Sequence, residues 1–343
     1  MPVHASRVPH PLASILRKDI IMVTLSSHAI QVENLRHIYR RGTGTRPALD
    51  GMNFSVRRGE IFGLLGPNGA GKTTIVKVLT TILRPSSGGA RVNGHDVLRE
   101  PLSVRRSIAA VLQENAVETL LSTWDNLLLY GYLHGYSRAE SRRRAESVIE
   151  TLELADHLQK RAQSLSGGFK RRLQVAKALM VDTPVLFLDE ATTGMDPIIK
   201  RRVIDAIRTQ ARAGRTVLLT TQLLDEAEEL CDRMLLMDFG KTLASGTMAE
   251  LRTLSAKFFH IRLGFASEPD GAVELLRALT PLSLSQAGRE YDIVVSGTEN
   301  EWIRHMANLS ERWPLAHLEI NAASLEEIFM QLYGVKHEKE EEA

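Results

Sequence analysis

Residues 66–74 read Gly66-Pro67-Asn68-Gly69-Ala70-Gly71-Lys72-Thr73-Thr74. The apolar run at 61–65 is typical of a buried strand, and the run at 75–79 has helical spacing. A strand, a glycine-rich loop and a helix in this order are the context that a phosphate-binding P-loop requires. The alternative is a glycine-rich turn with an incidental lysine, and both flanking elements argue against it. The whole segment is therefore predicted to bind a nucleoside triphosphate.

The residue types in this loop match the chemistry of phosphate binding. Gly66, Gly69 and Gly71 allow the backbone to curl so that successive N–H groups point inward. The helix that follows adds the positive end of its dipole beneath the same phosphates. We expect Lys72 to reach the β- and γ-phosphates and the Thr73 hydroxyl to ligate Mg²⁺.

Length and composition limit what surrounds this site. The 343 residues suffice for one large domain and a smaller one. With Lys+Arg 43 against Asp+Glu 41, charge gives no reason to propose nucleic-acid binding. Cys231 is the only cysteine, which excludes a disulfide framework and a thiolate zinc site, and we expect a small buried side chain there. No apolar stretch is long enough to span a bilayer, so any membrane part must come from another polypeptide.

The region before the P-loop contains an irregular segment followed by strand signals. Residues 1–28 show no sustained period, so we expect a disordered extension, and Met22 is an alternative start to Met1. Alternation begins at Ala29, and a second strand signal lies at 48–56. Tyr39 ends the first of these strands. It is either an edge-strand tyrosine or an aromatic that stacks on an adenine ring.

The region after the P-loop helix changes from strand signals to helical ones. A buried-strand run at 108–112 ends at Gln113, a residue whose role depends on its context. From Thr123 to about Lys160 the pattern is helical. The charge-dense stretch 138–146 favours a solvated helix face over a partner-binding face.

Two further segments carry polar residues at places suited to chemistry. Ser166-Gly167-Gly168 precedes an amphipathic helix, which predicts a second anion-binding helix N-terminus. The apolar run at 185–188 ends in Asp189-Glu190, at the sheet edge where open α/β sheets bind ligands. Asp189 suits Mg²⁺ coordination, and Glu190 suits general-base work on a water. Strands and helices continue to alternate up to about residue 237.

In combination, these motifs resemble the nucleotide-binding subunit of an ATP-binding-cassette (ABC) transporter over about residues 29–250. GPNGAGKTT matches Walker A, and VLFLDE matches Walker B with its catalytic glutamate. LSGGFKRRL matches the signature motif, with Phe169 where the family ordinarily has Gln. Residues 191–197 match the D-loop, with Met195 in place of the usual Leu. The implied fold is α/β: a P-loop NTPase cassette with a β-rich nucleotide-binding part and a helical subdomain at about 121–178.

The resemblance also implies roles for three isolated residues. Gln113 falls where the family has its Q-loop glutamine, a residue associated with catalysis and Mg²⁺. Tyr39 falls on the adenine-stacking aromatic. Gln222 falls on the switch histidine that contacts the γ-phosphate; its amide can donate a hydrogen bond but cannot carry a proton. Its structural alternative is a cap for the following helix.

The C-terminal region narrows the resemblance to one type of exporter. Residues 324–334 look like the closing helix of drug- and antibiotic-exporter ATPases of the daunorubicin-resistance type. The signals at 256–323 fit β-α-β-β-α-β, so we expect a small ferredoxin-like α+β accessory domain at 256–334. An acidic, disordered tail is expected at 335–343.

By this resemblance, the protein is expected to bind ATP and Mg²⁺, to pair head-to-tail with a second copy, and to drive a separate polytopic membrane permease. It would be peripheral, at the cytoplasmic face of the inner membrane, and would touch the membrane only through the permease. A soluble cassette ATPase acting on ribosomes or nucleic acid is the alternative; such proteins usually carry two cassettes or a long insertion. A simple P-loop kinase or GTPase is disfavoured by the signature motif.

Overall fold

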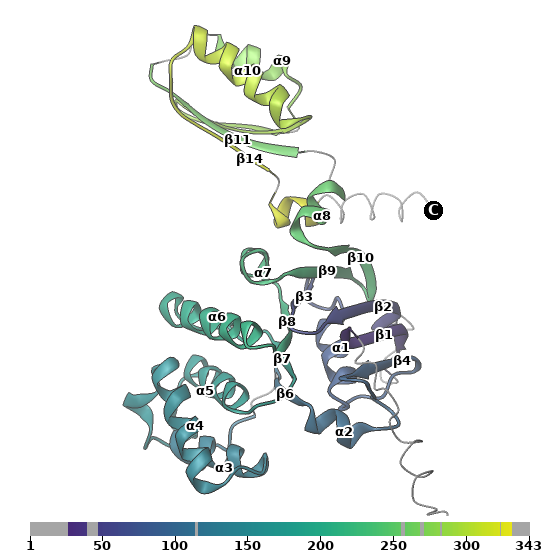
Figure 1. The fold of residues 1–343 in the computed structure, drawn as a ribbon. Helices are drawn as coiled ribbons and strands as arrows, with labels where there is room; N and C mark the ends of the chain where they lie inside the picture. Colours follow the sequence, from purple (N-terminus) through teal and green to yellow (C-terminus); the bar gives the residue numbers. More distant parts are fainter. Residues whose placement is uncertain are drawn as a thin grey trace, which may run out of the picture.

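The structure is a computed structural model that describes residues 27–39, 47–113, 116–254, 258–267, 271–281, 283–322 and 324–330. A disordered extension is expected at 1–28, and its residues 1–26 lie outside the described residues. The acidic tail expected at 335–343 lies wholly outside them. Figure 1 shows the cassette below and the C-terminal accessory region above it.

A six-stranded sheet forms the centre of the cassette, in the order β10-β9-β3-β8-β7-β6. The strands from β9 to β6 run parallel, and β10 is antiparallel to β9. β3, β7 and β8 are buried along their whole length because helices and the second sheet cover both faces. The bounds are β3 Ile61–Leu65, β6 Ile108–Val111, β7 Val185–Asp189, β8 Thr216–Thr221, β9 Arg233–Asp238 and β10 Lys241–Gly246.

An antiparallel sheet, β2-β1-β4-β5, lies on one side of this core. One cluster of apolar side chains joins the two sheets through α1, with Leu35, Phe62 and Ile75 fully buried in it. This cluster fixes the helix that carries the P-loop between the sheets. The bounds are β1 His28–His37, β2 Leu49–Arg57, α1 Lys72–Leu79, β4 Ser87–Val92, β5 His95–Asp96 and α2 Pro101–Arg106.

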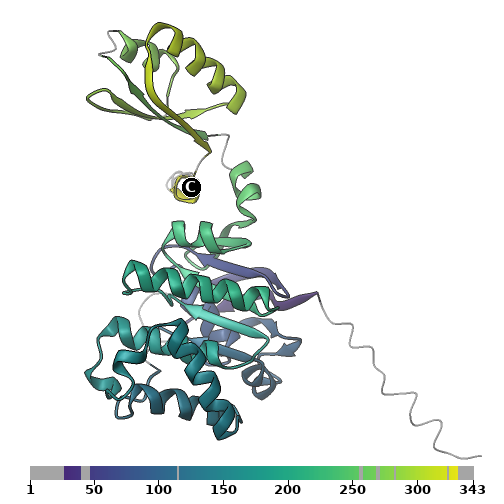
Figure 2. The ribbon, with the colours of Figure 1, turned by 60° about the vertical axis from the view of Figure 1, so that its left-hand side comes forward.

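The helical subdomain consists of α3, α4 and α5, which lie together at the far side of the central sheet from the antiparallel one (Figures 1 and 2). Each of these helices begins at a serine, Ser122, Ser137 or Ser166, whose hydroxyl accepts a backbone N–H from the first turn. The bounds are α3 Thr123–Leu133, α4 Arg138–Thr151, η1 Ala155–His157, η2 Ala162–Ser164, α5 Gly167–Met180, α6 Pro197–Arg212 and α7 Leu224–Leu230.

The accessory region has the element order β-α-β-β-α-β that the sequence predicts. Its antiparallel sheet has the order β12-β13-β11-β14, and α9 and α10 lie on one face of it. Ile261, Tyr291 and Trp302 are buried between sheet and helices. This arrangement is ferredoxin-like. The bounds are α8 Met248–Leu254, β11 Phe258–Phe265, α9 Ala272–Ala278, β12 Ser283–Ala287, β13 Glu290–Ser296, α10 Glu299–Arg312 and β14 Leu315–Ala322.

The helix at 325–330 leaves the accessory sheet and returns to the cassette, where it lies near α8 (Figure 1). Leu325 and Ile328 are fully buried in a cluster with Ala227, Leu236 and Leu251. The backbone N–H of Leu325 also donates to a carboxylate oxygen of Glu228 at 3.3 Å. This helix therefore completes the apolar core of the cassette.

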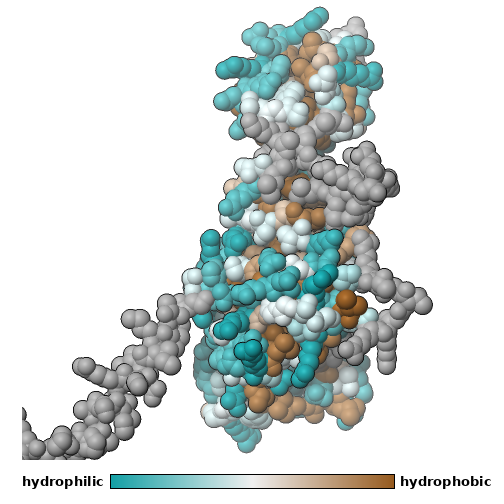
Figure 3. Space-filling model, turned by 90° about the vertical axis from the view of Figure 1, so that its right-hand side faces the viewer, coloured by the Kyte–Doolittle hydropathy of each residue, from teal (hydrophilic) through white to brown (hydrophobic). Residues whose placement is uncertain are grey.

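On the face shown in Figure 3, hydrophobic patches lie among hydrophilic residues and are most frequent in the lower part of the molecule. Among the described residues, none of the helices has the length and apolar character needed to cross a membrane.

Candidate nucleotide-binding site

The P-loop connects β3 to α1 and depends on glycine for a close approach. A Cβ added at Gly66 would lie 2.2 Å from the carbonyl oxygen of Met237, at the end of β9. Only glycine therefore allows the loop to begin this close to the neighbouring strand. The loop then turns directly into α1 at Lys72.

Lys72 is buried, and its ammonium lies within the loop. Its Nζ donates to the carbonyl oxygens of Gly66 at 2.7 Å and Pro67 at 3.0 Å. Burial lowers the pKa of Lys72, and the nearby carboxylates of Glu190 and Asp189 oppose this shift. The ammonium is thus held where phosphate oxygens could replace the carbonyls.

One cavity of about 480 Å³ gathers most of the residues predicted from the sequence. It brings together the aromatic from β1, the P-loop, the predicted Q-loop and switch glutamines and the predicted base. The lining residues are Tyr39, Ala48, Asn68, Gly69, Gly71, Lys72, Thr73, Thr74, Gln113, Glu190 and Gln222.

Asp189 is fully buried at the end of β7 and has the surroundings of a metal ligand. Its Oδ1 accepts hydrogen bonds from Thr220 Oγ1 at 2.5 Å and Thr73 Oγ1 at 3.3 Å. Its Oδ2 has no hydrogen-bond partner among the described residues, although a buried carboxylate oxygen needs one. Hard oxygen donors are what Mg²⁺ prefers, so Thr73, Asp189 and the amide oxygen of Gln113 fit this ion.

Glu190 follows in a backbone conformation that non-glycine residues rarely adopt, with φ at +52°. Its N–H donates to the backbone oxygen of Thr220 at 3.1 Å and to Thr220 Oγ1 at 3.2 Å. β8 therefore fixes the turn that directs this residue to the cavity.

Gln222 lies exposed in the loop between β8 and α7. The N–H of Leu223, where α7 begins, donates to Thr221 Oγ1 at 2.9 Å, and no side chain caps the helix. The structure therefore gives no support to the helix-capping alternative for Gln222, which lines the cavity instead.

Tyr39 presents a half-exposed ring at the end of β1. Its hydroxyl is 3.2 Å from Thr74 Oγ1, and its ring meets that of His37 edge-on at 4.6 Å between centroids. The ring is thus held from two sides at the mouth of the cavity, which is compatible with stacking on a base.

The signature residues stand apart from this cavity. Ser166 and Gly167 are exposed at the N-terminus of α5, and Ser166 Oγ accepts the N–H of Phe169 at 3.2 Å. A Cβ added at Gly168 would lie 2.5 Å from the carbonyl oxygen of Gly194, so this glycine allows the D-loop to lie against α5. Phe169, which replaces the family's usual Gln, is buried and stacks on His157.

Sequence reasoning missed three positions that hold the site together. Thr220, on β8, donates to the carboxylate of Asp189 and accepts the backbone N–H of Glu190. Glu226 is buried, accepts hydrogen bonds from Thr192 of the D-loop at 2.8 and 2.9 Å, and pairs with Lys200 at 3.1 Å. Arg171 reaches from α5 to backbone carbonyls. The sequence does indicate Thr220, because a threonine ends an apolar strand there. It does not indicate the contacts of Glu226 and Arg171, because they join segments far apart in the sequence.

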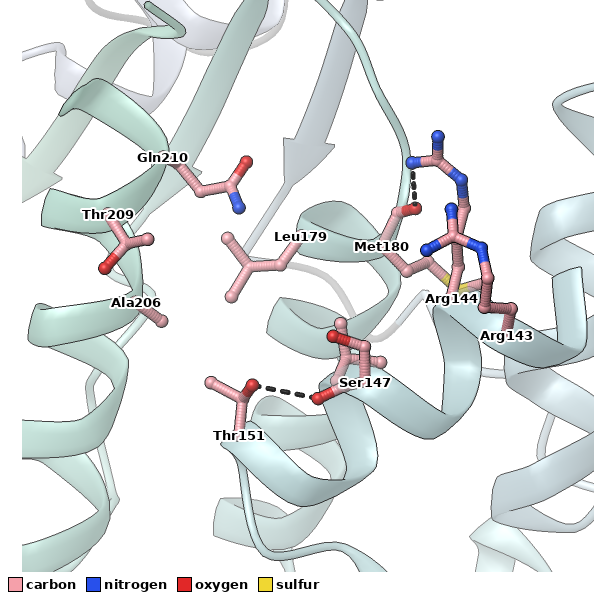
Figure 4. Close-up of a pocket in the computed structure, with 10 residues that line it drawn as sticks. Arg143, Arg144, Ser147, Thr151, Leu179, Met180, Ala206, Thr209 and Gln210 are labelled. Atoms are coloured by element: carbon pink, nitrogen blue, oxygen red, sulfur yellow. Dashed lines mark hydrogen bonds between the residues drawn. The ribbon is translucent and has the colours of Figure 1, made fainter. Parts of the chain in front are cut away.

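A second pocket, of about 400 Å³, lies between α4, α5 and α6 (Figure 4). Arg143 and Arg144, which line it, both pair with Glu140, and Arg144 also donates to the carbonyl oxygen of Met180 at 3.2 Å. Arg142 pairs with Glu146 on the exposed side of α4. The charged side chains of 138–146 are exposed or paired with one another, which is compatible with the solvated helix face expected there, and none of the predicted site residues lines this pocket.

Similarity to known proteins agrees with the nucleotide-binding site that the geometry indicates. Residues 49–193 match the model of the ABC transporter family. The daunorubicin/doxorubicin resistance ATP-binding protein DrrA of Streptomyces peucetius is 39% identical over 323 residues, which cover 91% of this chain and 94% of that protein. The chain belongs to the ATP-binding subunits of ABC transporters. Its ABC cassette binds and hydrolyses ATP, and the prediction of an ABC exporter ATPase is confirmed.

Other members of the ABC family are similar over different shares of the chain. The linearmycin resistance ATP-binding protein LnrL of Bacillus subtilis is 29% identical, covering 89% of this chain and 98% of that protein. A solved ATP-binding subunit of an ABC transporter has a TM-score of 0.61 and 27% identity, covering 66% of this chain and 92% of that one. ATP-binding subunits of ABC transporters work with a membrane permease. None of these relatives favours the alternative of a ribosome-associated ATPase.

Proposed function

We propose that this ABC subunit holds ATP with its adenine on Tyr39 and its phosphates in the loop from Gly66 to Thr74. The observation that carries the proposal is the cavity of about 480 Å³ that gathers Tyr39 and most of this loop with Gln113, Glu190 and Gln222. Thr73, Asp189 and Gln113 would hold Mg²⁺, which supplies charge neutralisation at the β- and γ-phosphates. The orphaned Oδ2 of Asp189 supports this assignment.

In this proposal two residues act on the terminal phosphate. Glu190 orients the attacking water and accepts its proton, because its carboxylate is the one acidic group that lines the cavity among the residues the structure describes. Gln222 donates an amide hydrogen bond to the γ-phosphate and keeps its loop in place until hydrolysis removes the acceptor. Both side chains are carried by segments that leave adjacent strands, β7 and β8, at the same edge of the sheet.

We also propose that two copies of the chain pair head-to-tail. Ser166 and Gly167 are exposed and outside their own cavity, so the anion-binding end of α5 is free to meet the nucleotide of a second copy. A post-hydrolysis cassette with ADP and Pi, similar in fold with a TM-score of 0.59, is described as dimeric. ATP would stabilise the closed pair, and hydrolysis would release it.

The pair is proposed to energise export of a drug-like compound through a separate permease at the cytoplasmic face of the inner membrane. Relatives named for daunorubicin, doxorubicin and linearmycin resistance support this class of cargo. Leu120, Tyr132 and Leu133, on and before α3, are exposed apolar residues and suit a contact with the permease. Nucleic acid is not a proposed partner, because the net charge is only +2. The proposed division of the chain is a cassette at 29–250 and an accessory domain from 256, whose expected end at 334 includes the helix at 325–330 that packs on the cassette.

Glu190→Gln tests the base in the purified full-length chain. We expect ATP affinity to be unchanged, turnover to fall by about 100-fold or more, and an ATP-bound dimer to accumulate in size-exclusion chromatography. Turnover at the wild-type rate would remove Glu190 from its proposed role.

Ser166→Arg tests the pairing, since it places a cation where the second nucleotide should approach. We expect the variant to bind ATP while dimerisation and hydrolysis fail together. Ser147→Arg, at an exposed serine of α4, is the matched control and should dimerise normally. If Ser166→Arg dimerises and hydrolyses like wild type, the head-to-tail arrangement is wrong. Purification from membranes should recover a polytopic protein with the wild-type chain.

A further inference from the structure

Arg171 connects the signature helix to the backbone of the nucleotide site. It lies in α5, and its guanidinium points away from the helix towards the ends of β6 and β7. Nη1 donates to the carbonyl oxygen of Leu112 at 2.5 Å, and Nε donates to that of Glu190 at 3.3 Å. Nη2 donates to the carbonyl oxygen of Asp189. One side chain therefore binds three carbonyls from two neighbouring strands.

The guanidinium is well suited to this position. Burial lowers the pKa of Arg171, while the charges of Asp189 and Glu190 oppose the shift. Gln174, one turn further along α5, accepts a further hydrogen bond from Nη1 at 2.9 Å and orients the group. A planar fork can serve several carbonyls at once, whereas the ammonium of lysine acts as a compact point charge.

The carbonyls that Arg171 binds belong to residues whose positions matter for hydrolysis. Glu190 has φ at +52°, and its N–H is held by Thr220 on one side while its carbonyl is held by Arg171 on the other. Leu112 directly precedes Gln113, which lines the same cavity. The guanidinium thus fixes the backbone that carries the Glu190 and Gln113 side chains.

We infer that Arg171 is a positioning residue for ATP hydrolysis. It holds the backbone that carries Glu190 and Gln113 at a fixed position relative to the signature helix α5. It does not touch the nucleotide cavity and acts through these two residues. Because α5 also carries Ser166 at its N-terminus, Arg171 connects the signature end of the chain to its own hydrolytic site. The inference rests on the proposed role of Glu190.

The test compares Arg171→Ala and Arg171→Lys with wild type in the full-length chain, with kcat, KM and equilibrium ATP affinity as readouts. Displacement of a catalytic group by about 1 Å can reduce a rate by about 10²-fold, so we expect Arg171→Ala to lower kcat by about 10- to 100-fold. KM and ATP affinity should stay within about twofold, because Tyr39 and the P-loop are untouched. Arg171→Lys should restore only part of kcat, and it serves as the test variant if the alanine variant does not fold.

Arg215 offers a matched control, because it is also a buried arginine bound to carbonyls. It donates to the carbonyl oxygens of Thr183 at 2.8 Å and Ala178 at 3.2 Å, away from the nucleotide cavity. Arg215→Ala should lower the melting temperature without changing kcat of the folded protein. If it lowers kcat as much as Arg171→Ala does, the effect is general destabilisation and the inference is wrong.

A double variant separates this inference from the proposed role of Glu190. In a Glu190→Gln background, Arg171→Ala should cause a smaller fold-loss of turnover than in wild type, because the part of its effect that acts through Glu190 is already lost. Wild-type kcat in Arg171→Ala, with Glu190→Gln inactive, would overturn the inference alone. Wild-type turnover in Glu190→Gln would instead overturn the proposed base.

Discussion

Replacing Thr220 with valine removes one hydroxyl from the centre of the hydrolytic site while keeping the volume of the side chain. Thr220 is 2% exposed at the end of β8. Its Oγ1 donates to Asp189 Oδ1 at 2.5 Å and accepts the N–H of Glu190 at 3.2 Å. Among the described residues, the valine variant leaves the carboxylate of Asp189 with only the longer contact to Thr73, whereas the Glu190 N–H keeps the backbone oxygen of Thr220.

The expected loss follows from these contacts. A hydrogen bond to a charged group contributes about 1.5–3 kcal/mol, and the Glu190 N–H adds little because it keeps a partner. Since about 1.4 kcal/mol corresponds to a factor of ten, we expect Thr220→Val to weaken the apparent Mg²⁺ affinity or lower kcat by roughly 10- to 150-fold. ATPase rates measured over a Mg²⁺ titration at saturating ATP distinguish the two effects.

Thr216→Val is the matched control at the other end of the same strand. Thr216 is equally buried, and its Oγ1 accepts the N–H of Gly59 at 3.0 Å, away from the nucleotide cavity. Both variants should melt at a lower temperature, but only Thr220→Val should change the Mg²⁺ titration. An unchanged titration curve for Thr220→Val would refute the role given to this hydroxyl.

Three other measurements test separate parts of the structure. Gln222→Ala should cut turnover several-fold while Gln222→His keeps or raises it, and equal turnover of Gln222→Ala and wild type would exclude a sensing role. Leu325→Ala should lower the free energy of unfolding by about 2–5 kcal/mol, measured by chemical denaturation, because this side chain is fully buried against the cassette. Burial raises the pKa of Tyr130 to about 12, so its phenol should ionise well above its ordinary value of about 10 in an ultraviolet titration. The folded state favours the neutral phenol of Tyr130. Its contribution to the free energy of unfolding is therefore complete below about pH 10 and is lost as the pH rises towards 12.

The sequence predicted best those parts of the site that are contiguous. The P-loop, the signature segment and Asp189-Glu190 each combine chemistry and local structure within a few residues, so a pattern in the sequence is enough to find them. The structure brings Tyr39, Gln113 and Gln222 to the same cavity, where the resemblance to ABC subunits had placed them.

Contacts between distant segments could not be predicted in this way. Arg171 binds carbonyls, which carry no sequence signal, and Glu226 meets Thr192 only because α7 and the D-loop are adjacent in space. β10 and α8 follow the last core strand that the sequence predicts for the cassette, in a region whose alternation is weak. The destination of the helix at 325–330 depends on which apolar surface remains uncovered after the cassette folds, and a local pattern does not contain that information.

The return of this helix makes the accessory region an insertion within the cassette rather than an appendage at its end. Excising residues 256–323 and closing the gap with a short linker would leave Leu325 and Ile328 in their cluster beside Leu251. Cutting the chain at residue 255 would instead uncover that cluster, which includes Leu65, the residue just before the P-loop. Both deletions remove the same small domain. Only the second also exposes the apolar cluster whose member Leu65 leads into the phosphate-binding loop.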